Sequence, residues 1–205
     1  MTKYGLTSRF SMRLSVLWIL AAGILPSLSR AQDAPVFVIT PEASTVTFFV
    51  KASVALEGSF EKWDATLTFT SPELSTGVLT VKIQADSVNT GSGMKDGKLK
   101  SKDFFDVKKD PLIMFKSTKI VQTGPNTFDV AGNFTIRGVT KPETLTLTLN
   151  REGEGSGEVK GTMAFDRKDY GMDSGIPFIK IADRVEVTVN LKAKRVSGPP
   201  VHLKQ

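Results

Sequence analysis

The stretch GSGMKDGKLKSKDFFDVKKDPLIMFKS, residues 91–117, decides how the rest of the chain is interpreted. On both sides of it, apolar and polar residues alternate at the period of β-strands, and this is the longest interruption of that pattern. It begins with Gly-Ser-Gly, presents Phe104 and Phe105 side by side, and ends at Asp110-Pro111, where proline stops regular structure. A new apolar run begins at Leu112. We therefore predict a lid or crossover that packs two aromatic side chains onto a β-structure and then re-enters it as a strand.

The flanking segments have the pattern of short β-strands. In residues 144–150, three leucines alternate with threonines, as expected for a strand with one buried face. Turn residues separate the segments about every ten residues. We expect a turn over residues 137–142, and Gly132 inside a strand predicts a bulge or a tight bend. The predicted strands are 36–39, 44–51, 65–70, 78–88, 127–136, 144–150, 159–165 and 184–192, and residues 113–115 and 118–121 form either a strand pair or one bent strand.

This pattern predicts one antiparallel all-β domain of about eight strands. Closure into a barrel removes unpaired strand edges, so we expect a barrel. A two-sheet sandwich has the same periodicity and stays open as the alternative. An eight-stranded barrel can enclose one small ligand.

Residues 1–31 have the features of a signal peptide. Lys3, Arg9 and Arg13 precede an uncharged apolar run from Leu14 to Leu25, and small residues before and at Ala31 fit a cleavage site. The run is shorter than the roughly 20 residues of a membrane span, although a short anchoring helix stays open as the alternative. We expect secretion by the general route and cleavage after Ala31. Residues 32–195 are then the β domain, and residues 196–205 a C-terminal tail.

The charge of the expected mature chain excludes nucleic acid as a partner. Of the 27 lysines and arginines, four lie in residues 1–31, which leaves 23 against 21 acidic residues. A net charge near +2 is not the basic footprint of a nucleic-acid-binding protein.

The residue types present also exclude several chemistries. The chain has no cysteine, and its one histidine, His202, lies in the predicted tail, so Ser-His-Asp, Cys-His and histidine-metal sites are excluded. Gly97-Lys98 lacks the other residues of a phosphate-binding loop. The acidic residues near Phe104 lack EF-hand spacing, so we expect no metal and no catalytic residue. An acid pair such as Asp96 with Asp103, acting on lipids or wall fragments, is the enzymatic alternative.

The predicted interior is strongly apolar. Thirteen phenylalanines against two tyrosines leave few hydroxyl groups to position a polar ligand, which favours an acyl or isoprenoid chain. Phe104 and Phe105 are expected to cover the opening of the barrel and to join the lumen residues in binding the ligand. The side chains expected to line the lumen are Phe48, Phe69, Ile83, Phe134, Leu147 and Met163.

Four stretches, in family order, give this chain a resemblance to the YceI-like proteins, exported bacterial lipid-binding β-barrels. The resemblance covers about residues 36–193, with one departure: the family typically has histidine where this chain has Lys98. The stretches are KDGKLKSKDFFD (95–106), PLIMFKS (111–117), GNFTIRGVTKP (132–142), and RKDYGM (167–172) with IADRV (181–185).

This resemblance implies an eight-stranded antiparallel lipocalin-like barrel with one short helical segment near residues 91–117. It also implies a periplasmic location, no catalytic residue, and a long amphiphile in the lumen, such as an isoprenoid quinone, a polyprenyl species or a fatty-acid derivative. Our leading hypothesis is thus a carrier without a cofactor of its own, which serves transport, storage or stress protection. Transient membrane contact and homodimerisation stay open.

A polar or phosphorylated head group would need cationic partners at the mouth of the barrel. The residues expected to supply them are Lys98, Arg137, Lys141 and Arg167. A different class of function stays open as the alternative: an interaction module with a solid core, whose outer face binds a membrane redox protein.

Overall fold

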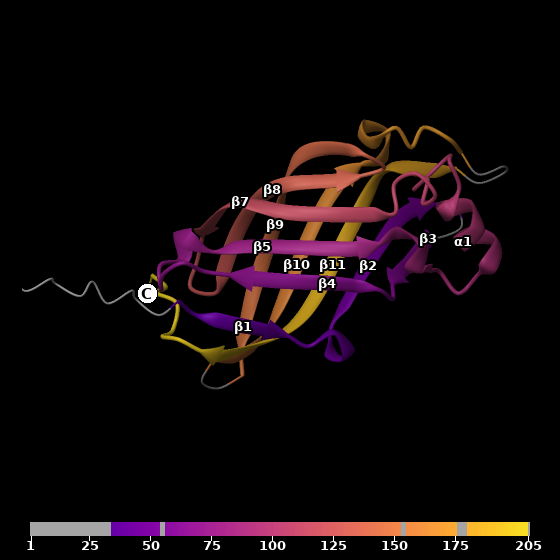
Figure 1. Ribbon diagram of the computed structural model, residues 1–205. Coiled ribbons are helices and arrows are strands. Elements are labelled where there is room, and N and C mark those ends of the chain that lie inside the picture. Colours follow the sequence, from indigo (N-terminus) through magenta and orange to yellow (C-terminus); the bar gives the residue numbers. More distant parts are fainter. Residues whose placement is uncertain (1–33, 54–55, 153–154, 176–179, 205) are drawn as a thin grey trace, which may run out of the picture. The chain divides into compact units, whose positions relative to one another are not determined.

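The protein is built almost entirely from β-strands (Figure 1). The computed structural model describes residues 34–53, 56–152, 155–175 and 180–204, all within one unit, so the predicted signal peptide lies outside the described residues. The strands are β1 (Val36–Ile39), β2 (Thr45–Ala52), β3 (Leu56–Phe60), β4 (Trp63–Thr68), β5 (Val78–Gln84), β6 (Val88–Asn89), β7 (Leu112–Gln122), β8 (Thr127–Ile136), β9 (Val139–Arg151), β10 (Ser156–Asp166) and β11 (Ile181–Ser197).

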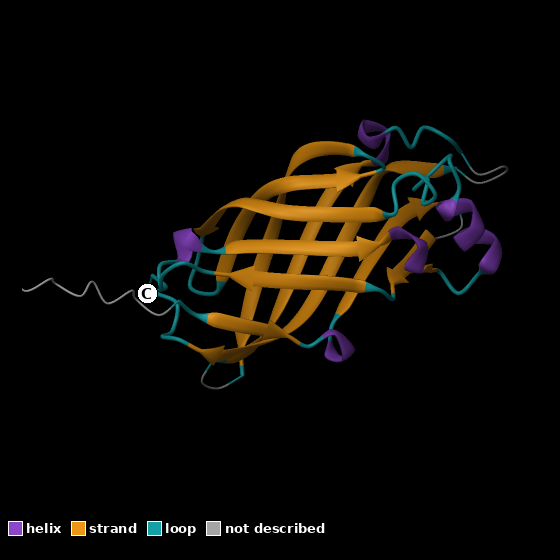
Figure 2. Ribbon diagram, in the orientation of Figure 1, coloured by secondary structure: helices purple, strands orange, loops and turns teal. Residues whose placement is uncertain are grey.

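The helices are short and lie at the ends of the strands (Figure 2). None of the helices in the described part of the chain is long and apolar enough to span a membrane. They are η1 (Pro41–Ala43), η2 (Leu74–Thr76), η3 (Ala85–Ser87), α1 (Gly93–Lys100) and η4 (Arg167–Tyr170).

Eight strands of six or more residues form one antiparallel sheet, in the order β4-β5-β7-β8-β9-β10-β11-β2. The sheet curls into a barrel, which confirms the predicted fold (Figure 2). Three shorter strands supplement it: β3 and β6 extend the β2 edge, and β1 pairs with β11. Among the described strands β4 pairs only with β5, and β1 lies along its other side (Figure 1). Side-chain packing closes the barrel between β1 and β4, since the ring centroids of Phe37 and Phe69 are 5.8 Å apart.

The alternating residues point inward as the sequence pattern predicts. On β2, β5, β8 and β11, every second residue faces inward, and most of these apolar side chains are buried in one core. The predicted irregularity at Gly132 is also present. Strand β7 bulges between Ser117 and Lys119, opposite Gly132, and the ring of Phe115 lies where a side chain on Gly132 would stand.

Residues 91–117 form the predicted cover at one end of the barrel. After α1, the chain turns so that Phe104 and Phe105 are buried, together with Leu99 of the helix. The amide of Phe105 donates to the carbonyl of Leu99 at 2.9 Å, which fixes this turn. The chain then re-enters the sheet as β7, as predicted.

Two local predictions were wrong. Only Arg137 and Gly138 form the turn predicted over 137–142; both have positive φ, as in two-residue β-hairpins. Strand β9 already begins at Val139 and includes Pro142, which is tolerated because β10 pairs with β9 only from Thr146 onward. Strand β3 was missed because Gly58 suggested a break, whereas the ring of Phe48 fills the space above that glycine.

We predict opposite stability effects for two glycine-to-alanine substitutions. In Gly132→Ala, the new Cβ would lie 2.6 Å from Phe115 Cζ and 2.7 Å from the Lys116 carbonyl oxygen, so unfolding should become easier by about 2 kcal/mol. In Gly97→Ala, no atom lies within 4 Å, and the helix should gain about 0.8 kcal/mol. Chemical denaturation measures both. Equal effects would contradict the packing described at Gly132.

Candidate functional site

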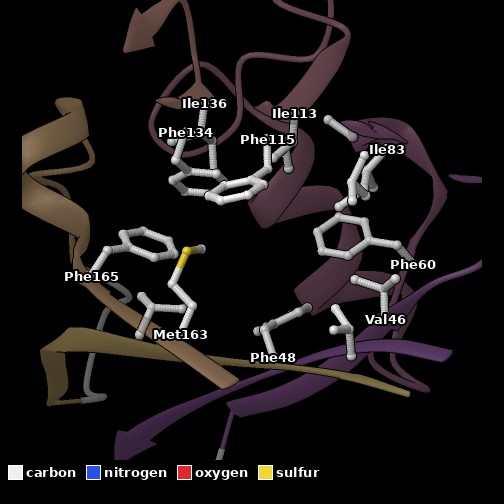
Figure 3. Packing of buried hydrophobic residues seen from close by; sticks show 14 of the residues in the cluster. Val46, Phe48, Phe60, Ile83, Ile113, Phe115, Phe134, Ile136, Met163 and Phe165 are labelled. Carbon is white, nitrogen blue, oxygen red and sulfur yellow. The ribbon is translucent and has the colours of Figure 1, made fainter. Parts of the chain in front are cut away.

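A layer of buried side chains divides the interior of the barrel into two cavities. We call Val81, Phe115, Met163 and Val189 the mid-barrel layer. All four are buried, and none of them lines either cavity. Each lies on its strand between residues of the two cavities, as Val81 lies between Ile83 and Leu79. Figure 3 shows Met163 and Phe115 pointing into the interior.

The cavity at the α1 end is small. Its volume is about 70 Å³, well below the roughly 300 Å³ at which ligand pockets begin. Its walls are apolar except for Arg167. Five of the residues predicted to line the lumen lie here, several of them shown in Figure 3: Phe48, Ile83, Phe104, Phe105 and Phe134.

An aromatic cluster packs beside this small cavity. Tyr170 of η4 is fully buried and makes edge-to-face contacts with Phe134 and Phe165, at centroid distances of 5.5 and 5.2 Å. Its hydroxyl donates to Glu143 at 2.9 Å. Burial, followed by this hydrogen bond, raises the pKa of Tyr170 above its usual value. The hydroxyl therefore stays protonated and has a partner, so it is not available to a ligand.

The cavity at the opposite end of the barrel is large. Its volume is about 1100 Å³, at the upper end of the range for small-molecule sites. Apolar side chains from eight strands form its walls: β1, β4, β5, β7, β8, β9, β10 and β11. Two of the predicted lumen residues, Phe69 and Leu147, lie here, whereas Met163 belongs to the mid-barrel layer. All the predicted lumen residues are therefore inside the barrel, but they are divided between two spaces.

The C-terminal segment, residues 198–204, crosses the mouth of the large cavity, and we call it the strap. Pro200, Val201 and Leu203 line the cavity. The amide of His202 donates to the Pro72 carbonyl at 2.8 Å, and its ring lies 2.8 Å from a carboxylate oxygen of Glu73. Gln122, at the end of β7, exchanges two hydrogen bonds with the backbone of Lys204. The predicted tail is thus packed against the barrel at several points.

The cation Arg167, predicted to bind a head group, is 6% exposed and lies at the α1 end. Its guanidinium donates to three carbonyl groups, those of Met172, Ser174 and Ala182, and to the carboxylate of Asp183 at 3.0 Å. Lys168 also bonds Asp183, and this hydrogen bond is the main cause of the lowered pKa of Asp183. These contacts join η4, the loop after it and the start of β11.

The other three predicted head-group cations also lie at the α1 end and have protein partners. Lys98 pairs with Asp103 at 2.6 Å, which lowers the pKa of that carboxyl, and lies over the ring of Phe104. Arg137 donates to the carbonyls of Lys102, at 2.7 Å, and Gly171. Lys141 pairs with Asp169 at 3.1 Å. The structure therefore gathers the four cations at one end, away from the large cavity.

Sequence reasoning missed the cations beside the large cavity. Arg151 and Arg195 line it, together with Lys204 of the strap. Arg151 continues the inward alternation of Leu145, Leu147 and Leu149 on β9, and Arg195 continues that of β11. Extending the alternation to the strand ends would have found both. The predicted strands end at residues 150 and 192, before either arginine.

The carboxylates of the enzymatic alternative bind different partners. Asp96 accepts hydrogen bonds from the amide and hydroxyl of Thr90, at 2.9 and 2.6 Å, whereas Asp103 binds Lys98. In the described part of the chain, no three His, Cys, Asp or Glu residues are grouped to hold a metal ion.

The fold and the two cavities define the class of protein: an antiparallel β-barrel with a large, mainly apolar internal site that is open at one end. The model of the YceI-like domain matches residues 37–193, so the chain belongs to the YceI-like family. A UPF0312 protein of Pseudomonas savastanoi pv. phaseolicola is 32% identical over 133 residues, which are 62% of this chain and 69% of the relative. One of Pseudomonas fluorescens is 36% identical over 99 residues, covering 48% of this chain and 52% of the relative.

Solved structures have the same fold. BcnA of Burkholderia cenocepacia is 26% identical, with a TM-score of 0.69 over 76% of this chain and 99% of BcnA. A polyisoprenoid binding domain from Saccharophagus degradans, implicated in plant cell wall breakdown, is 15% identical, with a TM-score of 0.62 over 78% of this chain and 99% of that domain. At this identity the second match shows the fold alone.

We predict that Arg167 stabilises the fold. Arg167→Met leaves three carbonyl groups without a donor and should lower the free energy of unfolding by about 3 kcal/mol. The matched control, Lys168→Met, removes only the exposed contact with Asp183 and should have a smaller effect. Thermal and chemical denaturation of both variants measure the difference. An Arg167→Met protein as stable as the wild type would contradict this role.

Proposed function

We propose that this chain is an exported, non-enzymatic carrier that holds one long-chain amphiphile in the large cavity. The ligand class is an isoprenoid quinone, a polyprenyl species or a fatty-acyl lipid, and the location is the periplasm. Transport, storage and protection of the lipid under stress all need the same binding step. The predicted signal peptide supports export, and the name of the Saccharophagus degradans neighbour supports the isoprenoid class.

The large cavity is the observation that carries this proposal. A space of about 1100 Å³ with mainly apolar walls would be costly to leave filled with water, because apolar surface is stabilised by removal from water. A long hydrocarbon chain matches its size and its chemistry. The solid-core alternative requires a filled interior, which the described residues do not form. Since the cavity opens at one end, exchange with a membrane needs only transient contact there.

Mass spectrometry of organic extracts tests the proposal directly. Full-length protein is expressed with its export segment, recovered from the exported fraction without detergent, and extracted. We expect one long-chain isoprenoid or acyl lipid per protein molecule. An empty extract, repeated after incubation with membrane lipids, would refute the carrier function.

A cavity-filling variant gives the same experiment a residue-level control. Val159 lines the large cavity on β10, and its neighbour Lys160 is exposed on the outer face. Val159→Trp should reduce lipid loading at least roughly tenfold because the indole occupies the cavity, whereas Lys160→Trp should load normally. Thermal unfolding confirms that both variants are folded. Equal loading by the two variants would place the lipid elsewhere.

We also predict that the strap slows ligand release. Deletion of residues 199–205 removes three apolar side chains from the cavity wall and the contacts with Pro72, Glu73 and Gln122. Dissociation of a fluorescent fatty acid should become at least roughly tenfold faster, with a similar unfolding midpoint, because these contacts lie outside the core. An unchanged dissociation rate would show that the strap does not gate the cavity.

A further inference from the structure

We infer that the large cavity selects lipids with an anionic head group, and that Arg151 and Arg195 bind that group at the mouth. This inference rests on the proposed carrier function and specifies its ligand. It differs from the sequence-based prediction, which placed the head group among cations that lie at the other end of the barrel.

The first argument is the position of the two arginines. Arg151 is the last residue of β9, and Arg195 is near the end of β11, both on the inner face and both lining the cavity. Strand β10 lies between them, with Gly157 paired to Arg151 on one side and to Ala193 on the other. Two strand spacings and two residues along β11 separate the Cα atoms by about 12 Å. Two extended arginine side chains can reach a shared anion across that distance.

The second argument is the space between the arginines. Gly155 and Gly157 face this region and have no side chains to occupy it. Gly155 has a φ of +75°, and a Cβ there would lie 3.4 Å from Arg195 Cβ. The same Cβ would lie 3.5 Å from Nε and Nη2 of Arg195, so the Arg195 side chain lies against this glycine, and glycine leaves room for it.

The third argument is the charge balance of the mouth. The described residues that line the cavity include Arg151, Arg195 and Lys204 and no acidic residue. Within the described chain, Arg151 has no carboxylate within 4 Å, and the side chain of Arg195 donates only to the Gly198 carbonyl, so most of its guanidinium donors are available. In contrast, the four cations at the α1 end each have a carboxylate or backbone carbonyl partner.

These features favour an anionic oxygen head group over a neutral one. An arginine fork forms bidentate, charge-assisted hydrogen bonds with phosphate and carboxylate oxygens. The hydrocarbon chain would extend from there toward the mid-barrel layer. A neutral head group, such as a quinone ring or an alcohol, would leave both guanidinium groups without an anionic partner.

Matched ligands test the inference. Full-length protein is stripped of co-purified lipid, and its affinity is measured for geranylgeranyl phosphate, for palmitate and for geranylgeraniol, the neutral alcohol with the same chain as the phosphate. We expect the phosphate to bind at least roughly tenfold more tightly than the alcohol, with a preference that weakens as salt is raised. Palmitate tests whether a carboxylate is also accepted.

Charge-matched variants assign the preference to the two arginines. Arg151→Gln/Arg195→Gln should bind phosphate and alcohol equally, and the binding of alcohol also shows that the variant is folded. Arg151→Gln alone should lose part of the preference without disturbing the strap. The control, Lys160→Gln/Lys194→Gln, removes two exposed charges from the outer faces of β10 and β11 and should keep the full preference.

Each contrary result is distinguishable. Equal binding of phosphate and alcohol by the wild type would refute the anionic subsite while leaving the carrier function intact. A preference that survives in Arg151→Gln/Arg195→Gln would place the subsite elsewhere. Binding of none of the three ligands would refute both the carrier function and this inference.

Discussion

Close packing across the middle of the barrel determines where a ligand can lie. The ring of Phe115 lies over Gly132 on the neighbouring strand, and a side chain at Gly132 would meet it at 2.6 Å. Val81, paired with Phe115 across β5 and β7, and Met163 and Val189 from the other side of the barrel complete the mid-barrel layer. All four side chains are buried between the residues that line the two cavities, so the layer separates the cavities. The two ends of the barrel can therefore serve different purposes.

The α1 end is built for stability. Its polar groups bind one another: Arg167 bonds three carbonyls and Asp183, Tyr170 bonds Glu143, and Lys98 bonds Asp103. Buried polar groups are stabilising only when their partners are present, so such a network opposes local opening. The opposite end is crossed by the strap, whose contacts involve exposed residues, as in segments that open at low free-energy cost.

The sequence predicted most of the fold because alternation and turn residues are local signals. The eight long strands, the inward faces and the lid with Phe104 and Phe105 were all predicted. Strand β3 and the start of β9 were missed because Gly58 and Pro142 have unfavourable propensities that the neighbouring strands compensate. The sequence pattern could not predict the division into two cavities, because the residues that separate the cavities have the same burial and period as those that line them. Which cations have partners depends on contacts distant in sequence.

The positions of the charged residues, rather than the net charge of the chain, indicate which ligand the barrel binds. The expected mature domain is nearly neutral, and the four cations of the α1 end named above all have protein partners. Arg195 is half-buried on the inner face of β11, and Arg151 is exposed at the end of β9. Both line the large cavity at the same mouth, with Gly155 and Gly157 between them. A charge that enters with the ligand would compensate them, and its hydrocarbon chain would fill the cavity behind it.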